Sequence, residues 1–458
     1  MRLLVIGGSD AGIAAALRAR ELDSSVEVTV VVADAFPNFS ICGLPYYLSG
    51  DVPDWRNLAH RTTSDLEQAG IQLLLDHTAR VIDPGAKQVT ITNPGGGGER
   101  QLGYDQLVVG TGAVPVRPPI DGLDLDGVHV LHTMGDTFAL HHTLTAGARS
   151  AVIVGGGYIG LEMAEAFTAR GLAVTLIEQA PAVMPTVDIE IGRVLGQELR
   201  RHHVQVVNDV TVKAIHRENG GLVVAGEPDF AVTADLVRVV VGVRPDTELA
   251  VAAGVQTGVR GPLQVDRRMR TNLPDVLAAG DCVETWHRLL GEPTYLPLGT
   301  TAHKQGRVAG ETAAGGDREF AGSLGTQVVK VFKLAVARTG LRDQEAAAAG
   351  LDTLTIGSTQ FDHKAYYPGA HQLHIRITGD RATGRLLGAQ LVGHHDAEVA
   401  KRIDIPANAL FHGMAVDGLN DLDLSYTPPF GSPWDAIQLA AQTWIQHAGE
   451  LHSRGSGA

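Results

Sequence analysis

Cysteine is scarce in this sequence, with only Cys42 and Cys282 among 458 residues. Two thiols are too few for a disulfide-stapled scaffold, and they exclude a cysteine-rich zinc or iron–sulfur site. Apolar runs of about 18 residues, the length that a membrane-spanning helix needs, are also missing. Residues 1–8 reach glycine too early for the apolar core of a secretory signal. These features predict a protein of the reducing cytoplasm with no membrane partner.

Positive charge is in deficit, because 37 lysine and arginine residues face 51 aspartate and glutamate residues, for a formal net charge of −14. A surface this acidic repels phosphate backbones, so we expect no nucleic-acid partner. Hydrophobic residues nevertheless make up 44% of the chain, which is enough for packed interiors. At roughly 150 residues per domain, the length predicts about three domains.

Histidine could in principle supply a metal site, and 19 are present. They include three adjacent pairs, His141–His142, His202–His203 and His394–His395. Because neighbouring side chains point apart on a helix or a strand, such pairs make poor chelators. We therefore expect solvated surface histidines and no metal site.

Glycine is abundant, with 55 residues that gather where apolar runs end. The first run, residues 2–6, leads through a glycine-rich turn into a helical segment at 11–22 and a buried strand at 26–33. This order predicts a β–α–β unit that binds a dinucleotide pyrophosphate at the helix N-terminus. Asp34 is the first carboxylate after the strand, one or two positions late for a ribose contact. The turn consists of Gly7, Gly8, Ser9, Asp10, Ala11 and Gly12, with Ser9 at the middle glycine position.

A second unit repeats this order, with Gly155 standing 148 positions after Gly7. Glu178 closes its second strand, 18 residues after Gly160. A carboxylate at this place accepts hydrogen bonds from the adenosine 2′-hydroxyl and repels a 2′-phosphate, so we expect NADH to be preferred over NADPH. The fingerprint is complete and comprises Gly155, Gly157, Tyr158, Ile159 and Gly160, followed by Glu162.

The chain changes character at about residue 326, where alternating patterns replace the glycine-rich loops. Segments 328–332 and 374–377 are predicted strands, and 397–415 and 434–447 are predicted helices. The predicted fold class is α/β, with two Rossmann-like dinucleotide-binding domains and a C-terminal α+β domain. The predicted boundaries are 1–114 with 246–325 for the first domain, 115–245 for the second, 326–452 for the third, and 453–458 for a frayed tail.

Two further strand–turn segments flank the second unit, one at Thr111–Gly112 and one ending at Asp281. In this order, the segments and the two units resemble the FAD-dependent pyridine nucleotide-disulfide oxidoreductases over nearly the whole chain. The resemblance implies FAD in the first domain and NAD(H) in the second. It places Thr111–Gly112 at the crossing between them, Asp281 on the flavin ribityl chain, and Gly242 among the cofactor contacts. The third domain is a dimerisation domain in that family, which implies a homodimer.

Cys42 follows the first unit, within the segment 38–47. Two-cysteine members of the family carry a partner five residues on, where this sequence has Tyr47. Cys282 adjoins Asp281, and we interpret it as a small buried residue. The resemblance therefore implies that Cys42 cycles alone, between a thiolate and a sulfenic acid or a mixed disulfide with a small thiol. A flavin alongside and a helix start near Cys42 are expected to favour the thiolate.

The single-cysteine branch of the family contains coenzyme A disulfide reductases, NADH oxidases and NADH peroxidases. The oxidases and peroxidases carry a histidine in the first glycine loop, where this sequence has Asp10, so that acid–base partner is lost. The reductases receive two tyrosines from the partner subunit, and Tyr366 and Tyr426 match them here. His303 matches a histidine that contacts substrate in those reductases.

Other positions depart from the reductase pattern. Asn38 replaces a serine, and Ile41 replaces an asparagine that touches coenzyme A. Trp434 stands where a coenzyme A-binding lysine can occur. Arg18, on the first predicted helix, is a candidate phosphate contact. The residues that recognise coenzyme A are thus partly replaced, and the identity of the disulfide stays open.

We therefore predict an FAD enzyme that uses NADH to reduce a small disulfide or related sulfur compound at Cys42. Tyr366 and Tyr426 are expected to lie beside the leaving thiol. One alternative is an NADH oxidase that forms peroxide or water. The other is an electron-carrier or redox-sensing flavoprotein in which Cys42 is structural.

Overall fold

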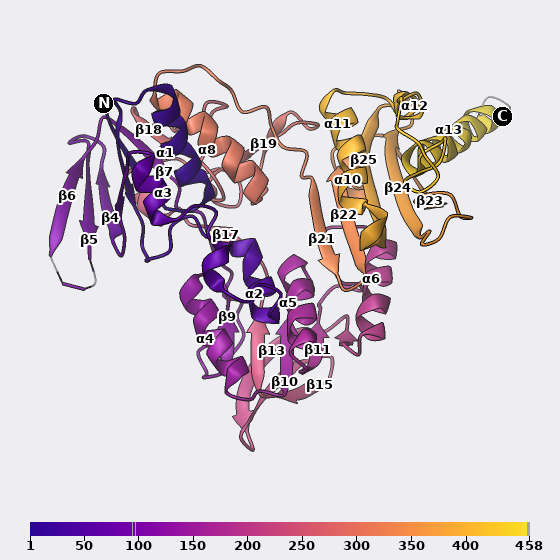
Figure 1. The fold of residues 1–458 in the computed structure, drawn as a ribbon, viewed down its shortest axis with the longest axis horizontal. Coiled ribbons are helices and arrows are strands. Elements are labelled where there is room, and N and C mark those ends of the chain that lie inside the picture. Colours follow the sequence, from indigo (N-terminus) through magenta and orange to yellow (C-terminus); the bar gives the residue numbers. More distant parts are fainter. Residues whose placement is uncertain (94, 97, 456–458) are drawn as a thin grey trace.

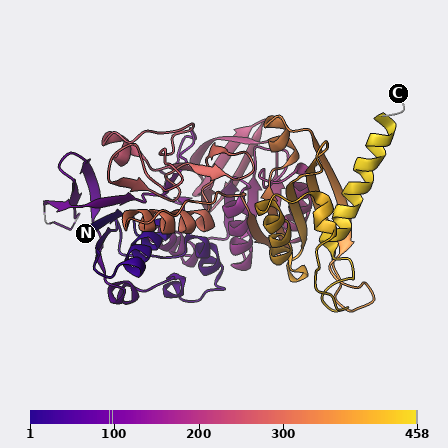
Figure 2. The same ribbon diagram turned by 90° about the horizontal axis from the view of Figure 1, so that it is seen from above.

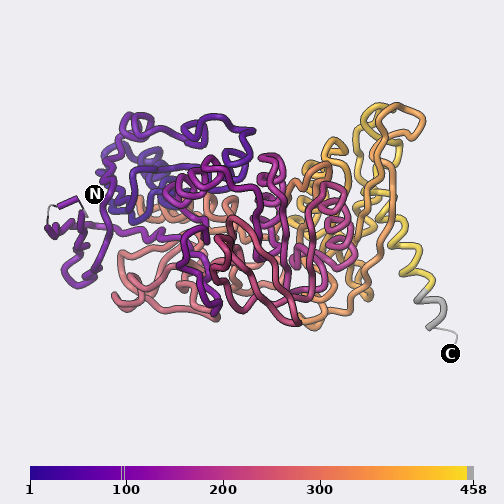
Figure 3. Tube along the Cα trace, turned by 90° about the horizontal axis from the view of Figure 1, so that it is seen from below, coloured from indigo at the N-terminus to yellow at the C-terminus, as the bar shows by residue number. Residues whose placement is uncertain are grey.

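The computed structural model describes residues 1–93, 95, 96 and 98–455. Figure 1 shows three sheet-based parts: the first carries the N-terminus, the second lies below the centre, and the third carries the C-terminal helix α13 (Ala436–Gly455). Seen from above, the first and third parts lie towards opposite ends of the molecule (Figure 2). The backbone trace places the N-terminus and α13 at opposite ends as well (Figure 3). The long axis therefore runs from the first part to the third part.

The first part is built on a parallel five-stranded sheet of order β18-β7-β1-β2-β3. β1 (Arg2–Ile6) pairs in parallel with β2 (Glu27–Val31), and α1 (Asp10–Leu22) connects the two strands. These three elements form the predicted β–α–β unit. The other elements are η1 (Ile41–Gly43), α2 (Leu44–Ser49), η2 (Trp55–Leu58), α3 (Thr63–Gln68), β3 (Ile71–Leu74), β4 (Thr78–Asp83), β5 (Gln88–Thr92), β6 (Glu99–Gly103), β7 (Gln106–Val109), α7 (Glu248–Ala252), β18 (Val276–Ala278), β19 (Thr285–His287), β20 (Glu292–Thr294) and α8 (Gly299–Ala313). The chain thus returns to this sheet after forming the second part.

Helix α8 lies directly against α1. A Cβ added at Gly306 would fall 2.2 Å from the carbonyl oxygen of Ala11, a distance that no side chain tolerates. The two helices therefore approach backbone to backbone, which only a residue without a side chain permits. This close packing brings α8 residues to the first glycine loop, at the start of α1.

The second part repeats the architecture, with a parallel sheet of order β12-β11-β10-β16-β9. β10 (Ser150–Val154) and β11 (Ala173–Ile177) flank α5 (Tyr158–Ala169), the second predicted unit. The chain enters through β8 (Ala113–Pro115) and leaves through β17 (Val243–Pro245), which pair antiparallel. The remaining elements are β9 (Val128–Val130), α4 (Met134–Thr145), α6 (Ile189–Arg201), β12 (Gln205–Val207), β13 (Thr211–Glu218), β14 (Gly221–Glu227), β15 (Phe230–Ala234) and β16 (Leu236–Val239).

The third part is an antiparallel sheet of order β21-β22-β25-β24-β23, with helices packed on it. Trp444 of α13 is buried against the sheet, and its indole N–H donates to the carbonyl oxygen of Leu354 at 2.8 Å. Its elements are β21 (Gln327–Val331), β22 (Leu334–Gly340), α9 (Asp343–Ala348), β23 (Thr353–Phe361), β24 (Gln372–Asp380), β25 (Leu386–His394), η3 (His395–Ala397), α10 (Val399–Arg402), α11 (Asp404–Phe411), α12 (Val416–Asn420) and α13.

The C-terminal elements differ in detail from those predicted. The predicted helix at 397–415 is divided into α10 and α11. Glu398 and Gly413 have φ values of 55° and 70°, and these left-handed positions limit the helical run. α13 continues to Gly455, so 453–455 of the predicted tail are helical, while 456–458 lie outside the described residues. The domain boundaries stay a prediction. Among the helices of the described residues, none has the length and apolar character to cross a membrane.

Candidate active site

The first glycine loop connects β1 to α1 and fits a bound pyrophosphate. Gly7 has a φ of 109°, and a Cβ there would lie 2.0 Å from the carbonyl oxygen of Gly110. A Cβ at Gly12 would lie 2.0 Å from the carbonyl oxygen of Gly7, so the helix starts tightly against the loop. Ser9 is the N-cap of α1, and within the described chain its side chain makes no capping hydrogen bond. The first N–H groups of α1 are therefore free to bind an anion such as the FAD pyrophosphate.

The second loop has the same construction around α5. A Cβ at Gly160 would lie 2.0 Å from the carbonyl oxygen of Gly155, and Gly155 has a φ of 110°. Gly157 is the N-cap of α5, and a Cβ there would meet none of the described atoms within 4 Å. The middle glycine thus faces open space, where a second dinucleotide could approach the backbone. Ile159 is exposed in the first turn of α5.

Tyr158 connects the second loop to the third part of the chain. Its hydroxyl donates a hydrogen bond to the side-chain oxygen of Gln327 in β21. Burial raises the pKa of Tyr158 to about 12, so its phenol stays protonated at neutral pH. This predicted cofactor-binding residue therefore also holds the start of the C-terminal sheet.

Glu178 follows β11 and is buried, with 6% of its surface exposed. One carboxylate oxygen accepts the N–H of Gly156 at 2.7 Å, and the other accepts the N–H of Ala180 at 2.8 Å. These two bonds fix the carboxylate beside the second loop. Its remaining lone pairs can accept from a ribose hydroxyl, as the predicted role requires.

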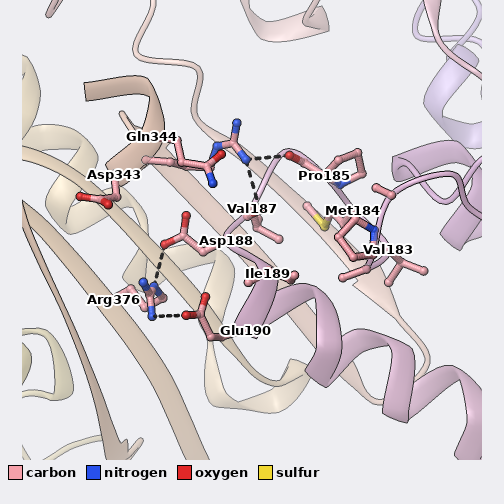
Figure 4. A pocket seen from close by; sticks show the side chains of 14 residues that line it. Val183, Met184, Pro185, Val187, Asp188, Ile189, Glu190, Asp343, Gln344 and Arg376 are labelled. Atoms are coloured by element: carbon pink, nitrogen blue, oxygen red, sulfur yellow. Dashed lines mark hydrogen bonds and ion pairs between the residues drawn. The ribbon is translucent and has the colours of Figure 1, made fainter. Parts of the chain in front are cut away.

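A cavity of about 400 Å³ lies between the segment that follows β11 and the third part of the chain (Figure 4). Segment 180–190 forms one wall, and Arg342, Asp343, Gln344 and Arg376 of the third part form the other. Arg376 is paired with Asp188 at 2.7 Å and with Glu190 at 3.7 Å. Arg342 pairs with Glu345 at 3.1 Å, a carboxylate that it shares with Arg338 at 2.7 Å.

The crossing between the first and second parts of the chain contains the next three predicted residues. The hydroxyl of Thr111 donates to the carbonyl oxygen of Asp246, and the N–H of Asp246 donates to Gly112 at 3.0 Å. The carbonyl oxygen of Gly242 accepts the N–H of Val116 at 2.9 Å. Cβ atoms at Gly112 and Gly242 would meet nothing of the described structure within 4 Å. Both glycines thus border open space. The hydrogen bond from Thr111 to Asp246 links the residues next to β8 and β17.

Asp34 and Asp281 are the carboxylates predicted on the FAD side. The side chain of Asp34 accepts the N–H of Phe36 at 2.9 Å, and burial raises its pKa. Burial and the nearby charge of Asp10 raise the pKa of Asp281 to about 6. A buried carboxylate costs free energy when it is charged and has no hydrogen-bond donor beside it. Asp281 is therefore suited to accept hydrogen bonds from the hydroxyl groups of a ribityl chain. Cys282 is fully buried, as predicted, and burial raises the pKa of its thiol to about 11.

Cys42 lies in the short turn η1, where the hydroxyl oxygen of Ser40 accepts the N–H of Gly43 at 3.1 Å. The side chain is exposed. The surrounding protein nevertheless reduces its hydration, which raises the pKa of the thiol, and the charges of Glu162, Asp10 and Asp281 raise it further. The expected helix start is present, but α2 has only six residues and does not offset these carboxylates.

Glu162 on α5 is the carboxylate that acts most strongly on Cys42. Burial and the charge of Glu165 raise the pKa of Glu162 to about 7, while a hydrogen bond with Tyr46 opposes this. Lys330 of β21 pairs with Glu165, whose other oxygen accepts the N–H of Phe332 at 2.8 Å. The sequence suggested Glu162 only as a cofactor contact. Its contact with Tyr46 joins segments more than 100 positions apart, which no local pattern signals.

A second cavity of about 400 Å³ lies between α1 and α8. His303 of α8 reaches the first glycine loop, with its Nε2 3.3 Å from a carboxylate oxygen of Asp10. Asn38 lines the same cavity with 1% of its surface exposed. Both polar atoms of its side-chain amide have no hydrogen-bond partner among the described residues. Three cations that the sequence did not single out, Arg61, Lys304 and Arg307, also line it, together with the carboxylate of Glu21 and apolar residues of α1.

Arg18, a predicted phosphate contact, is engaged elsewhere. Its guanidinium pairs with Glu311 at 2.6 Å and with Glu21 at 2.9 Å, and 15% of its side chain is exposed. Two carboxylates on one guanidinium leave little positive charge for a ligand. Arg307 pairs only with Glu21, at 3.2 Å, and Arg61 and Lys304 pair with no carboxylate of the described residues, so these three cations are better placed for that role.

Tyr366 and Tyr426 lie on two exposed loops of the third part. These loops are adjacent, because the N–H of Lys364 donates to the carbonyl oxygen of Pro428 at 3.4 Å. Figure 1 shows β23 and β24, which flank the first loop, far to the right of α2 beside Cys42. The structure thus brings the two loops together but does not bring them to Cys42 of the same chain.

The prediction that neighbouring histidines point apart was wrong for one pair, His394–His395. His394 and His395 stack with ring centroids 4.6 Å apart, because β25 ends at His394 and a turn begins at His395. Strand alternation therefore does not separate them. In the other pairs, His141 and His202 are half-buried and stack on aromatic rings.

Two family models match the chain: "Pyridine nucleotide-disulphide oxidoreductase" over residues 1–306, and its "dimerisation domain" over residues 326–436. The chain belongs to this family. The predicted resemblance and fold class are thereby confirmed. A pyridine nucleotide-disulphide oxidoreductase is an enzyme that uses NAD(P)H, and family membership implies FAD and NAD(P)H as its cofactors.

Similar proteins support this assignment over nearly the full length. A Pyrococcus horikoshii protein named "NAD(P)H coenzyme A polysulfide/persulfide reductase" is 33% identical over 96% of this chain and 98% of its own. A Methanocaldococcus jannaschii "NADH oxidase" is 31% identical over 96% and 98%. The solved structure of a "NAD-Dependent Persulfide Reductase" from A. fulgidus has a TM-score of 0.95 and 36% identity, and covers 98% of this chain and 84% of that chain. These relatives bear names from both reaction classes predicted from the sequence.

Proposed function

We propose that this enzyme is an FAD-dependent, NADH-preferring reductase of a small disulfide or related sulfur compound that carries phosphate groups, such as coenzyme A disulfide. The observation that carries the proposal is the cavity beside Asp10. It combines three cations, Arg61, Lys304 and Arg307, with the buried, unpartnered amide of Asn38, and its two carboxylates, Asp10 and Glu21, pair with His303 and Arg307. Cations bind phosphates, and a buried amide gains most from a ligand with polar groups.

The residues proposed to hold FAD are those of the first loop with Asp34, Thr111, Gly112 and Asp281. Those proposed for NADH are the second loop with Tyr158, Ile159, Glu162, Glu178 and Gly242. Bound FAD would supply the two-electron transfer from NADH to sulfur. Glu178 supports NADH, because its fixed carboxylate would repel the 2′-phosphate of NADPH.

In the proposed reaction, the sulfur of Cys42 attacks one sulfur of the disulfide. An S–S bond forms with Cys42, the substrate S–S bond breaks, and the first thiolate takes a proton from a phenol. Two electrons, which originate from NADH, then break the mixed disulfide and release the second thiol. The balance is one disulfide, one NADH and one proton giving two thiols and NAD⁺. The exposure of Cys42 supports this role over a structural one.

The proton donors are proposed to be Tyr366 and Tyr426 of a second copy of the chain. Both side chains are exposed in the dimerisation domain, away from Cys42 of their own chain. A homodimer in which each loop pair reaches across to the other copy completes the site. The absence of a membrane-spanning helix among the described residues and the two thiols fit our proposal of a cytoplasmic location.

A substrate panel tests the proposal. NADH consumption is measured without oxygen for coenzyme A disulfide, glutathione disulfide, cystine and polysulfide. We expect the phosphate-bearing disulfide to give the highest kcat/KM, and Arg307→Ala to lower it by about 10-fold, the value of one charge-assisted contact. Arg193→Ala on α6, outside the cavity, is the control. Equal turnover of all disulfides, unaffected by Arg307→Ala, would contradict the substrate assignment.

The NADH oxidase activity stays a second candidate because of His303. The sequence argument against it was that Asp10 replaces a loop histidine, yet His303 places an imidazole 3.3 Å from Asp10. An acid–base group therefore stands at the first glycine loop after all. Oxygen consumption with NADH alone, in wild type and His303→Gln, measures this activity. Disulfide turnover well above oxygen turnover is the result our proposal requires.

A further inference from the structure

Three histidines and one aspartate gather where β25 ends. His371 precedes β24, His394 is the last residue of β25, and His395 begins η3. The rings of His371 and His394 stack with centroids 4.0 Å apart, and His394 and His395 with centroids 4.6 Å apart. The carboxylate of Asp396 lies 2.8 Å from Nδ1 of His395 and 3.5 Å from Nδ1 of His394.

This set has the ligand chemistry of a transition-metal site. Nδ1 of His394 accepts the backbone N–H of Asp396 at 3.3 Å, so a metal ion that binds this nitrogen would replace that hydrogen bond. Ligand atoms of His394, His395 and Asp396 all lie within 4.8 Å of one another. Among the residues that the structure describes, they are the one group of three side chains that meets this test. Two imidazoles and a carboxylate suit Zn²⁺, Co²⁺, Ni²⁺ or Cu²⁺ better than Mg²⁺ or Ca²⁺.

We propose that His394, His395 and Asp396 bind a divalent transition-metal ion of the zinc type. His371 stacks on His394 and fixes the orientation of its ring. His371 also closes the loop that carries Tyr366, since its N–H donates to Asp362 at 2.9 Å and its carbonyl oxygen accepts from Asp362 at 3.0 Å. The metal would thus lie at the base of that loop. The proposal does not depend on the sulfur substrate.

The test is metal binding to the chelator-treated, full-length FAD enzyme. Zn²⁺ is titrated by calorimetry, and Co²⁺ by its visible d–d absorption, which reports the coordination geometry. We expect one ion per chain, and affinity about 10- to 100-fold weaker in His395→Ala and in Asp396→Asn. Both residues are exposed, so neither substitution removes core packing.

His374→Ala is the matched control, because His374 is an exposed histidine of the same sheet that pairs with Thr359. Its affinity for Zn²⁺ should equal that of the wild type. Far-ultraviolet circular dichroism and flavin absorbance check that each variant is folded. The proposal is overturned if the wild type binds no Zn²⁺ saturably. It is equally overturned if His395→Ala and Asp396→Asn bind Zn²⁺ as the wild type does.

Discussion

Cys42 combines an accessible sulfur with a thiol pKa that the protein raises. An exposed sulfur can meet a disulfide, whereas the carboxylates of Glu162, Asp10 and Asp281 oppose the free thiolate. Reactivity at this residue therefore depends on how nearby charges are compensated. Among these carboxylates, Glu162 raises the pKa of the Cys42 thiol most, so its substitution should change that pKa most.

Replacing Glu162 by Gln removes the largest negative charge acting on Cys42. We expect the pKa of the Cys42 thiol to fall, so that its alkylation by iodoacetamide becomes fast at lower pH than in the wild type. The rate is measured against pH in a Cys282→Ala background. Glu67→Gln, on the exposed side of α3, is the control. An unchanged alkylation profile in Glu162→Gln would show that Glu162 does not set the state of the thiol.

Glu162 should also make stability depend on pH. Its pKa is about 7 in the folded protein against 4.5 ordinarily, so the folded state keeps a proton that the unfolded state has lost. The contribution of Glu162 to the free energy of unfolding is therefore fully present below about pH 4.5 and is lost as the pH rises towards 7. Glu162→Gln should match the wild type in Tm near pH 4.5 and exceed it at pH 8. A Tm difference that does not change with pH would refute this sign.

Among the elements, the two strand–loop–helix units were predictable because their chemistry is local. A pyrophosphate-binding turn needs glycines at fixed spacing, and Gly7, Gly12, Gly155 and Gly160 occupy positions that exclude a Cβ. The strands at 328–332 and 374–377 could also be predicted from local alternation, and they correspond to β21 and to part of β24.

Contacts between distant segments could not be predicted in this way. His303 meets Asp10 because α8 packs on α1, and Tyr46 meets Glu162 because α2 packs on α5. No pattern within either segment encodes these pairings. The stacking of His394 and His395 was mispredicted because the strand ends between them, and a boundary error of one residue reverses such an argument.

The loop–helix element around Glu178 should determine the choice of nicotinamide cofactor. Glu178→Gln keeps an acceptor for Gly156 but removes the charge that repels a 2′-phosphate. We expect the ratio of kcat/KM for NADPH to that for NADH to rise about 10-fold, which corresponds to about 1.4 kcal/mol. Steady-state kinetics with both cofactors measures it, with Glu218→Gln in β13 as control. No change in the ratio would remove Glu178 from this role.

For the whole molecule, the account requires two copies of the chain. Cys42 and the loops of Tyr366 and Tyr426 are apart within one chain, and the family model names the C-terminal part a dimerisation domain. Each proposed site therefore takes its cysteine from one copy and its phenols from the other. This arrangement can be tested by mixing two inactive variants.

Chains with Cys42→Ser are combined with chains with Tyr426→Phe, and heterodimers are isolated through two affinity tags. Tyr426→Phe alone should lower disulfide turnover by about 10- to 10⁴-fold, the range for losing a hydrogen bond or a proton donor. In a site shared between copies, the heterodimer keeps one intact site and should recover about half of the wild-type turnover. A heterodimer as inactive as its parents would instead place both residues in a site within one chain.

The central claim is that Cys42 carries electrons to a disulfide, and Cys42→Ser tests it most directly. The two half-reactions are followed without oxygen by stopped-flow absorbance: reduction of bound flavin by NADH, and its reoxidation by coenzyme A disulfide. We predict wild-type flavin reduction in Cys42→Ser, because the nicotinamide side is unchanged, together with loss of reoxidation by the disulfide. Cys282→Ala should show both half-reactions. Rapid reoxidation of Cys42→Ser by the disulfide would contradict the account.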